Sequence, residues 1–334
     1  MKLKLLPLAI GAVIAMPGAA IAAPTLYGKV NLTIENYDNN PDGDSSDFDR
    51  WEVNSNSSRI GVKGSEKISE SLSAVYKAEF EMYVDDGDKS GRTFGQRNIY
   101  GGLKGGFGEV LIGKFDTPLK TVQNKVDVFS DYQLGDIKNL IKGENRVDNV
   151  IQYSAPKMGA IAAKVALLQG EEECTSAVVG DCDDGLADGF SASLAFEQDG
   201  VYAGLGVDSD VKGWDATRLV VQANIDAIQL GFLYQTAEQA DVDNAEEQVG
   251  YILSGAMKLG SDGKVKLQYG VSELDNKGNN TSAETVDKTQ VAIGYDHKLS
   301  KQTKLFTHYI ILEEEQGSAK DEESTLAFGL EHKF

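Results

Sequence analysis

The sequence predicts an all-β fold, a sixteen-stranded antiparallel transmembrane β-barrel, and three features carry this prediction. The chain ends in a segment, residues 324–334, whose apolar and polar side chains alternate up to the C-terminus. Its first 22 residues have the pattern of an export signal. Between these ends, alternation recurs in strand-length segments whose connections are short and long in turn. An outer-membrane barrel needs such strands, because a closed sheet leaves no backbone group unpaired in lipid.

The N-terminal segment predicts export. A basic start is followed by the apolar run Leu5–Ile14 and by Ala20-Ile21-Ala22, which has the small residues of a cleavage site. We therefore expect residues 1–22 to be a cleaved signal peptide. An uncleaved membrane anchor is the alternative, but the apolar run is too short to span well and no stop-transfer pattern follows. Residues 23–334 then form a single barrel domain without a linker.

Composition excludes several classes of protein. After the signal, no apolar run reaches the roughly 18 residues that a transmembrane helix needs. The chain has 52 acidic and 32 basic residues, and removal of Lys2 and Lys4 leaves 30 basic residues and a net charge of −22. Such a charge argues against nucleic acid as a partner. The three histidines lie near no nucleophile motif such as G-x-S-x-G, so we expect no catalytic residues, no enzyme activity and no cofactor.

Segments with a period of two fill the mature chain. In residues 26–35, the apolar Leu26, Val30 and Ile34 alternate with a polar set that includes Lys29 and Glu35. The same pattern recurs in residues 72–83, 190–197 and 264–271. A charged side chain is costly against lipid and tolerated against water. The apolar faces therefore point outward, and the polar faces line a water-filled lumen.

Connections between these segments alternate in length. The short ones occupy residues 65–69, 105–106, 156–159, 197–200, 226–227, 260–263 and 299–302. The long ones are acidic, rich in Gly, Asn and Ser, and centre on Pro41, Gly87, Gly143, Gly180, Lys212, Asn244, Asn279 and Gly317. These breaks divide the chain into about sixteen strands, with short periplasmic turns and long external loops. A β-sandwich fits less well, because its loops are comparable at both ends.

Five motifs resemble those of the Gram-negative general porins. They are NSNSSRIGVKGSE (residues 54–66), FGQRNIYGGLKGGFG (94–108), GKFDTPL (113–119), DNVIQYSAP (148–156) and FGLEHKF (328–334). The resemblance covers the chain from about Leu26 to Phe334. It implies a homotrimeric channel in the outer-membrane lipid for passive diffusion of ions and small hydrophilic solutes. Two other functions stay open: a solute-specific outer-membrane channel, and an outer-membrane hydrolase on a barrel scaffold.

Residues 116–146 form the longest connection and carry many aliphatic side chains, which purely solvent-facing loops lack. In the resembling family this third loop folds into the lumen and narrows it. The alternative is a loop packed over the barrel mouth or under a neighbouring subunit. We expect the inward fold, with acidic loop residues facing basic wall residues across the constriction. The loop candidates are Asp116, Asp127, Asp131 and Asp136, and the wall candidates are Lys29, Arg59, Lys63, Arg97 and Gln152.

The charges predict a weak ion selectivity. Arg59 and Arg97 at the constriction favour anions, whereas the acidic outer loops favour cations at the mouth. The resembling family often has Arg at the position of Gln152 and commonly has Arg at that of Lys114, so the basic contribution is weaker here. We expect a weak preference for cations that is strongest in dilute salt, where charges at the mouth are screened least.

Two further sites are predicted in the outer loops. Cys174 and Cys182 are the only cysteines, share one long acidic loop and enter an oxidising compartment, so we expect a disulfide between them. Part of a calcium-loop pattern is matched by Asp38, Asn40, Asp42 and Asp49. The usual last ligand is Glu and flanking helices are absent. An acidic solvated loop is thus the simpler interpretation, and bound Ca²⁺ is the alternative.

Glycines indicate where subunits of a homotrimer would meet. Small residues allow two backbones to approach closely on the outer wall. The candidate patch comprises Gly101, Gly102, Gly105, Gly106 and Gly113. A tight turn explains Gly105 and Gly106 equally well.

Overall fold

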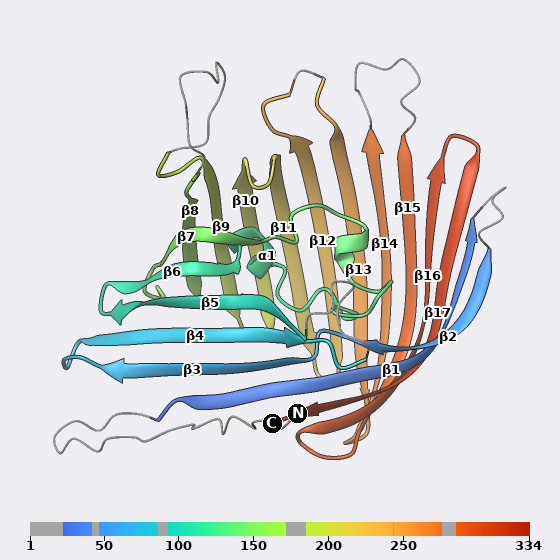
Figure 1. Cartoon of the computed structure of the whole chain (residues 1–334), viewed down its shortest axis with the longest axis horizontal. Helices are drawn as coiled ribbons and strands as arrows, with labels where there is room; N and C mark the ends of the chain where they lie inside the picture. The colour runs from blue at the N-terminus through green and yellow to red at the C-terminus, as the bar shows by residue number, and fades with distance from the viewer. Residues whose placement is uncertain (1–22, 42–46, 86–92, 172–184, 243, 276–284) are drawn as a thin grey trace, which may run out of the picture.

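The computed structural model describes residues 23–41, 47–85, 93–171, 185–242, 244–275 and 285–334. These residues form one antiparallel sheet that curves into a barrel, with a helical connection inside it (Figure 1). Across these ranges, no helix has the length and apolar character needed to cross a membrane. The strand segments of these ranges are β1 (Thr25–Pro41), β2 (Phe48–Ser55), β3 (Arg59–Lys67), β4 (Leu72–Met82), β5 (Phe94–Gly105), β6 (Gly108–Asp116), β7 (Arg146–Ser154), β8 (Ile161–Leu168), β9 (Gly189–Gln198), β10 (Val201–Ser209), β11 (Trp214–Ile225), β12 (Ile228–Gln239), β13 (Glu247–Leu259), β14 (Gly263–Asp275), β15 (Val286–Lys298), β16 (Thr303–Gln316) and β17 (Ala319–Lys333).

The sheet closes because its first strand pairs with its last. β1 runs antiparallel to β17, with Lys29 opposite Lys333 at one end of the ladder. Beyond this pair, Gly28 N donates to Phe334 O at 3.0 Å, and Phe334 N donates to Gly28 O at 3.1 Å. The C-terminal aromatic residue therefore takes part in closure. In the described chain, β2 pairs with β1 alone, and each of the other strand segments has a paired neighbour on both sides, as a barrel in lipid requires.

β2 and β3 are two halves of one strand. Both pair with β1: residues 32–39 of β1 pair with β2, and residues 25–29 pair with β3. The interruption lies at Asn56–Ser58, where Ser57 has a φ of 51°. There the Ser58 hydroxyl oxygen accepts a hydrogen bond from Asn31 N at 2.9 Å, which satisfies a donor that the ladder leaves free. Counting this interrupted pair once gives sixteen antiparallel strands, so the predicted barrel is confirmed.

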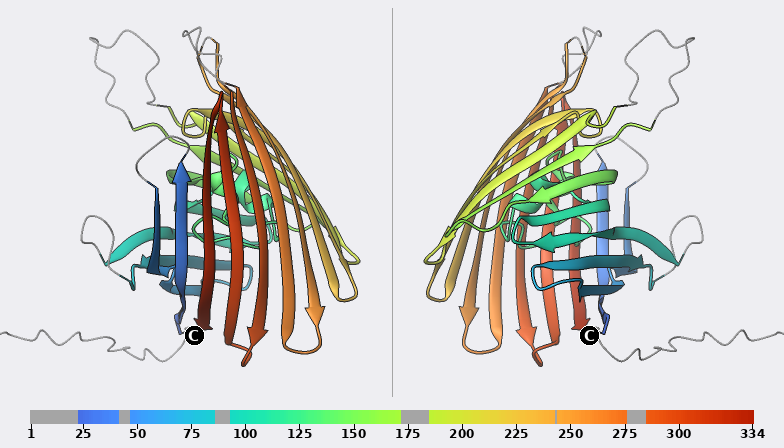
Figure 2. Two further views of the ribbon diagram at one scale, coloured as in Figure 1. Left: turned by 90° about the vertical axis from the view of Figure 1, so that its right-hand side faces the viewer. Right: turned by 90° about the vertical axis from the view of Figure 1, so that its left-hand side faces the viewer.

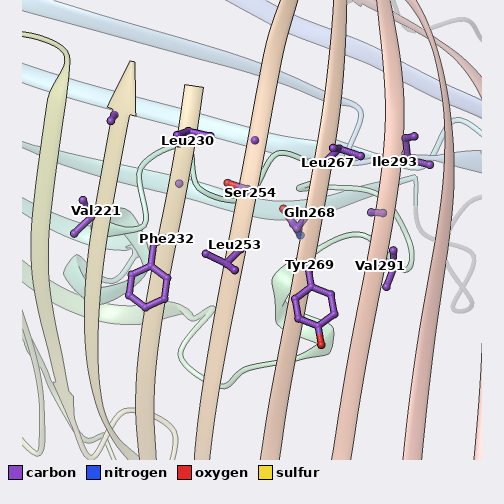
Figure 3. Close-up of a pocket in the computed structure, with 14 residues that line it drawn as sticks. Val221, Leu230, Phe232, Leu253, Ser254, Leu267, Gln268, Tyr269, Val291 and Ile293 are labelled. Atoms are coloured by element: carbon purple, nitrogen blue, oxygen red, sulfur yellow. The ribbon is translucent and has the colours of Figure 1, made fainter. Parts of the chain in front are cut away.

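Side chains along each strand alternate between two environments. On β1, Ile34 is 57% exposed on the outer wall, whereas Glu35 beside it is 1% exposed. An apolar outer wall is stable against lipid, and polar side chains are stable inside. Figure 3 shows part of the outer wall, where Phe232, Leu253 and Tyr269 border an apolar groove of about 790 Å³ across β11 to β15. This groove belongs to the outer wall rather than to the charged lumen.

The connections confirm the predicted asymmetry with two corrections. Two residues join β11 to β12 at one end of the barrel, whereas 29 residues lie between β6 and β7. The long loops predicted around Lys212 and Gly317 are, however, tight turns. Four residues join β10 to β11, and two join β16 to β17. Glycine permits both reversals, because Gly213 has a φ of 75° and Gly317 a φ of 60°.

Residues 117–145, here called loop 3, fold into the barrel (Figure 1), and the side views place them within the height of its wall (Figure 2). They contain α1 (Pro118–Val122) and the 3-10 helix η1 (Ile137–Asn139). Thr117 Oγ1 caps α1 by accepting from Lys120 N at 3.2 Å, and proline begins the helix. The predicted inward fold of this connection is confirmed.

Candidate channel constriction

Apolar side chains of loop 3 pack on an apolar patch of the inner wall. Phe129, Ile137 and Leu140 are at most 2% exposed. Their wall partners come from β11, β12, β13, β15 and β16 and include Val220, Leu233, Ile252, Ala292 and Ile310. Wall glycines permit the approach, since a Cβ at Gly270 would lie 2.3 Å from Leu140 Cδ1. Each buried aliphatic or aromatic side chain contributes about 1.5–3 kcal/mol, so loop 3 is firmly held against this side.

Four glutamines on consecutive strands bind the backbone of loop 3. Gln248 Nε2 donates to Leu140 O at 3.0 Å, and its Oε1 accepts from Lys142 N at 2.8 Å. The other three are Gln235 of β12, Gln268 of β14 and Gln290 of β15. Buried backbone groups need hydrogen-bond partners, and an irregular segment has no ladder to supply them. The sequence prediction did not include these residues, although Gln on the polar face of four neighbouring strands was a readable signal.

Asp131 connects loop 3 to the opposite wall. Its Oδ2 lies 2.7 Å from Lys29 Nζ on β1 and 3.3 Å from Arg59 Nη2 on β3. Burial opposes ionisation of this carboxyl, but Lys29 and Arg59 outweigh the effect and lower the pKa of Asp131. Asp131 thus lies where an acidic loop residue was predicted, beside two of the predicted wall residues.

Arg97 and Lys63 line the same wall but have other partners. Arg97 Nε lies 3.1 Å from Glu79 Oε1, and its Nη1 lies 3.1 Å from Glu81 Oε2. Both carboxylates belong to β4, so the guanidinium is held within the wall. The Lys63 ammonium lies 5.1 Å from the ring centre of Tyr27, a cation–π contact.

Asp127 and Asp136 shape loop 3 itself, which corrects the prediction that they face wall cations. Asp127 Oδ1 accepts from Phe129 N at 3.0 Å, and Oδ2 accepts from Ile137 N at 3.2 Å. Asp136 caps η1 and lies 3.9 Å from Lys138 Nζ of the same loop. Burial raises the pKa of Asp127, and the neighbouring Asp136 adds to the shift. Both carboxylates serve backbone N–H groups that a tight turn leaves without partners.

Asp116 lies at the base of loop 3, where β6 ends. Its Oδ1 is 3.0 Å from Arg146 Nη2, at the start of β7, and 3.5 Å from Lys120 Nζ. This carboxylate therefore joins the two ends of the loop rather than facing the Lys29 wall. Gln152 of β7 is 7% exposed and stands opposite Leu111 of β6.

Two predicted sites lie wholly or partly outside the described residues. Cys174 and Cys182 fall outside them, so the disulfide stays a prediction. Asp42 also falls outside, whereas Asp38 of β1 stands opposite Asp49 of β2, and Asn40 lies two residues farther along β1. In the described ranges, no group of three or more His, Cys, Asp or Glu is arranged to hold a metal ion. Calcium binding by the complete pattern therefore also stays a prediction.

A closed barrel with an apolar outer wall, a charged lumen and a loop bound inside it defines a membrane channel. A family model described as Gram-negative porin matches residues 9–314, and the chain belongs to this family. It is an outer-membrane porin, a channel for passive diffusion, and members of its family are channels without enzyme activity.

Individual relatives agree with this assignment. The chain is 30% identical over 337 residues to outer membrane porin protein 32 of Delftia acidovorans, covering 95% of this chain and 91% of the relative. It is 27% identical to the major outer membrane protein P.IB of Neisseria sicca, with both chains covered in full. An anion-selective porin from Comamonas acidovorans has the same fold, with a TM-score of 0.77 and 24% identity over 93% of this chain and 99% of that one. The trimer form of OmpT from Vibrio cholerae has a TM-score of 0.64 and 15% identity, covering 93% of this chain and 99% of that chain.

Proposed function

We propose that solutes pass between loop 3 and the wall of β1, β3 and β5, and that the fixed charges there nearly cancel. The observation that carries this proposal is Asp131, whose carboxylate contacts both Lys29 and Arg59. On the adjoining wall, Glu79 and Glu81 pair with Arg97. Lys77 Nζ also lies 3.2 Å from Glu79 Oε2, and Lys29 Nζ lies 3.8 Å from Glu331 Oε2, so four carboxylates pair with four cations here.

A nearly balanced constriction leaves ion selectivity to the charges on either side of it, and the excess of acidic over basic residues in the chain, 52 against 32, favours cations. A relative from Comamonas acidovorans is described as anion-selective. This chain has neutral Gln152 where the wider family often has Arg, which supports a smaller positive charge at the constriction of this chain. The expected result is a weak cation preference that grows as salt is diluted, because the Debye length rises from about 3 Å at 1 M to about 10 Å at 0.1 M.

Reversal potentials across a series of KCl gradients in planar bilayers test this proposal. A small cation preference at low salt that fades at high salt supports it. A strong anion preference that persists at low salt would show that Arg59 and Arg97 dominate, and would refute the proposed balance.

We further propose that the porin functions as a homotrimer. The solved trimer form of a protein with the same fold supports this, as does the outer wall near β5. A Cβ at Gly101 or Gly106 would meet no heavy atom within 4 Å in its own barrel, so these two positions are open for a neighbour. Gly102, Gly105 and Gly113 instead pack within their own barrel, with a Cβ at Gly102 only 2.0 Å from Val110 O, so the open part of the predicted glycine patch is limited to Gly101 and Gly106.

Light scattering in mild detergent tests the assembly. We expect the mass of three chains, reduced by Gly101→Trp but not by Leu267→Trp on the lipid-facing wall of β14. A monomer in the native protein would contradict the proposal.

Calcium binding at the outer end of β1 and β2 is proposed for Asp38, Asn40, Asp42 and Asp49. The facing positions of Asp38 and Asp49 in the hairpin support it. Calorimetric titration with Ca²⁺, compared with Asp42→Ala, tests it. Equal heats for the two proteins would exclude the site.

A further inference from the structure

The inner face of β1 changes sign along its length. Its lumen-facing residues are Lys29, Asn31, Thr33 and Glu35, read from the periplasmic end outward. At about 3.3 Å per residue, the basic and acidic ends of this row lie about 20 Å apart. β17 beside it carries Lys333 paired with Glu331 near the closure and Glu323 toward the outer end.

Below loop 3, on the periplasmic side, basic residues outnumber acidic ones around a cavity of about 400 Å³, here called the inner vestibule. Its basic residues are Lys29, Arg59, Lys125, Lys264, Lys266, Lys304 and Lys333. Three of its carboxylates, Asp131, Asp296 and Glu331, each lie within 4 Å of two of these cations. The fourth, Asp127, is directed into loop 3 and has a raised pKa.

Lys125 and Lys264 are the basic residues of this vestibule for which the described chain provides no ion pair within 4 Å. Asp296 stands opposite Lys264 in the β14–β15 ladder but already pairs with Lys266 at 3.3 Å and Lys304 at 3.1 Å. Seven basic residues against four carboxylates leave a net charge of +3 on the inner vestibule.

Above loop 3, the same part of the wall is acidic. The lumen-facing charges on the outer halves of β1, β2, β15, β16 and β17 are Glu35, Glu52, Glu314, Asp321 and Glu323 against Arg50 and Lys288. Glu35 and Glu52 both accept from the amide of Asn54. Among the described residues of these strands, the five carboxylates outnumber the two cations, and the acidic outer loops of the sequence add to the negative charge.

From this separation we infer that the channel rectifies ionic current, passing more when the external side is positive. The acidic outer half enriches mobile cations, and the basic inner vestibule enriches mobile anions. An external positive potential drives both populations toward loop 3, so the ion concentration there rises and conduction increases. The opposite potential withdraws both from loop 3, and conduction falls.

Current–voltage curves in symmetric KCl test this inference, which rests on the proposed channel but not on its selectivity. Orientation is established by Ser318→Cys in the external turn between β16 and β17, with a thiol reagent added to one side. At 0.1 M KCl and 100 mV, we expect the current with the external side positive to exceed the reverse by about 1.5-fold or more. At 1 M KCl the two currents become nearly equal, because the charges are screened over about 3 Å.

Matched variants identify the charges responsible. Lys264→Gln and Lys125→Gln each remove one uncompensated vestibule charge and should bring the current ratio closer to one. Lys320→Gln removes the same charge from the turn end of β17, where Lys320 pairs with Glu313 and Glu315, and should not bring the ratio closer to one. Heat-modifiable migration on gels checks that each variant is folded.

Equal currents in both directions at 0.1 M KCl, or the larger current at the opposite polarity, would overturn the inference. Rectification that both vestibule variants retain in full would also overturn it. Reversal potentials from the same bilayers report selectivity separately. Rectification with an anion preference would refute the proposed selectivity and leave this inference standing. Symmetric currents with a cation preference would overturn this inference and leave the proposed selectivity standing.

Discussion

Arg218 of β11 lies 2.7 Å from Glu144 Oε1, and its guanidinium is completely buried between the barrel wall and loop 3. The same guanidinium donates to Leu119 O and Lys142 O, both at 3.4 Å. One wall residue therefore binds the beginning and the end of a loop that spans the lumen. Its position indicates that loop 3 is anchored by charge as well as by apolar packing.

Replacing Arg218 should loosen loop 3. Arg218→Ala leaves Glu144 buried without its closest partner, and loss of one member of a buried ion pair costs about 3–5 kcal/mol. We expect a lower temperature of heat modification and a larger, noisier single-channel conductance. Arg50→Ala is the control, because the Arg50 side chain is exposed and its pair with Glu52 contributes at most about 1 kcal/mol. Quiet currents at native conductance in Arg218→Ala would rule out the anchoring role.

Neutralising Asp131 should shift selectivity toward anions. Asp131→Asn removes the negative charge that Lys29 and Arg59 share, so Arg59 loses this partner and Lys29 keeps only Glu331, at 3.8 Å. Reversal potentials in a KCl gradient should move in the anion direction. Asp136→Asn makes the same charge change on a residue that caps η1, and we expect a smaller shift. Shifts of equal size in the two variants would indicate that only the total charge of the loop matters.

The effect of the Asp131 charge on ion selectivity should persist at acidic pH. Its pKa lies below the ordinary value of 3.8, so the carboxylate stays ionised as pH falls from 7 to 4 and is lost only at lower pH. Other carboxylates also titrate, and the difference between the native protein and Asp131→Asn isolates this residue. We expect the difference in reversal potential to be constant down to about pH 4 and to vanish below it. A difference that disappears between pH 6 and 5 would contradict the Lys29 and Arg59 contacts.

Asp127 should be replaceable by Asn but not by Ala. Burial already disfavours its charged form, and an amide oxygen can still accept from Phe129 N or Ile137 N. Asp127→Ala leaves two buried N–H groups unpaired, at about 1–3 kcal/mol each. Thermal unfolding and channel noise should be near native in Asp127→Asn and clearly altered in Asp127→Ala. Indistinguishable behaviour of the two variants would remove the turn-forming role.

The proposed Cys174–Cys182 disulfide closes a short loop and should stabilise that loop by about 3 kcal/mol or less. Mass spectrometry after alkylation without reduction should detect no modified thiol, and reduction should expose two. Two alkylated cysteines in the unreduced protein would exclude the bridge.

Alternating side chains determined the barrel from the sequence alone. A period of two separates a lipid-facing from a water-facing surface. Ile34 and its neighbour Glu35 follow this period, because a charged side chain is costly against lipid and an apolar side chain is costly against water. Closure through Gly28 and Phe334 was likewise readable, since alternation continues to the last residue. Turn length was less readable: acidic and glycine-rich composition is shared by long loops and tight turns, so Gly317 was misassigned.

Only the tertiary structure decided which loop charges meet the wall. Asp127, Asp131 and Asp136 are indistinguishable by residue type and spacing, yet only Asp131 contacts Lys29 and Arg59. The other two bind backbone N–H groups created by the fold of the loop itself. That fold depends on contacts with strands more than 70 residues away, such as Arg218 with Glu144. Local patterns carry the periodicity of a strand, whereas the partner of a buried charge depends on which distant segments the closed sheet brings together.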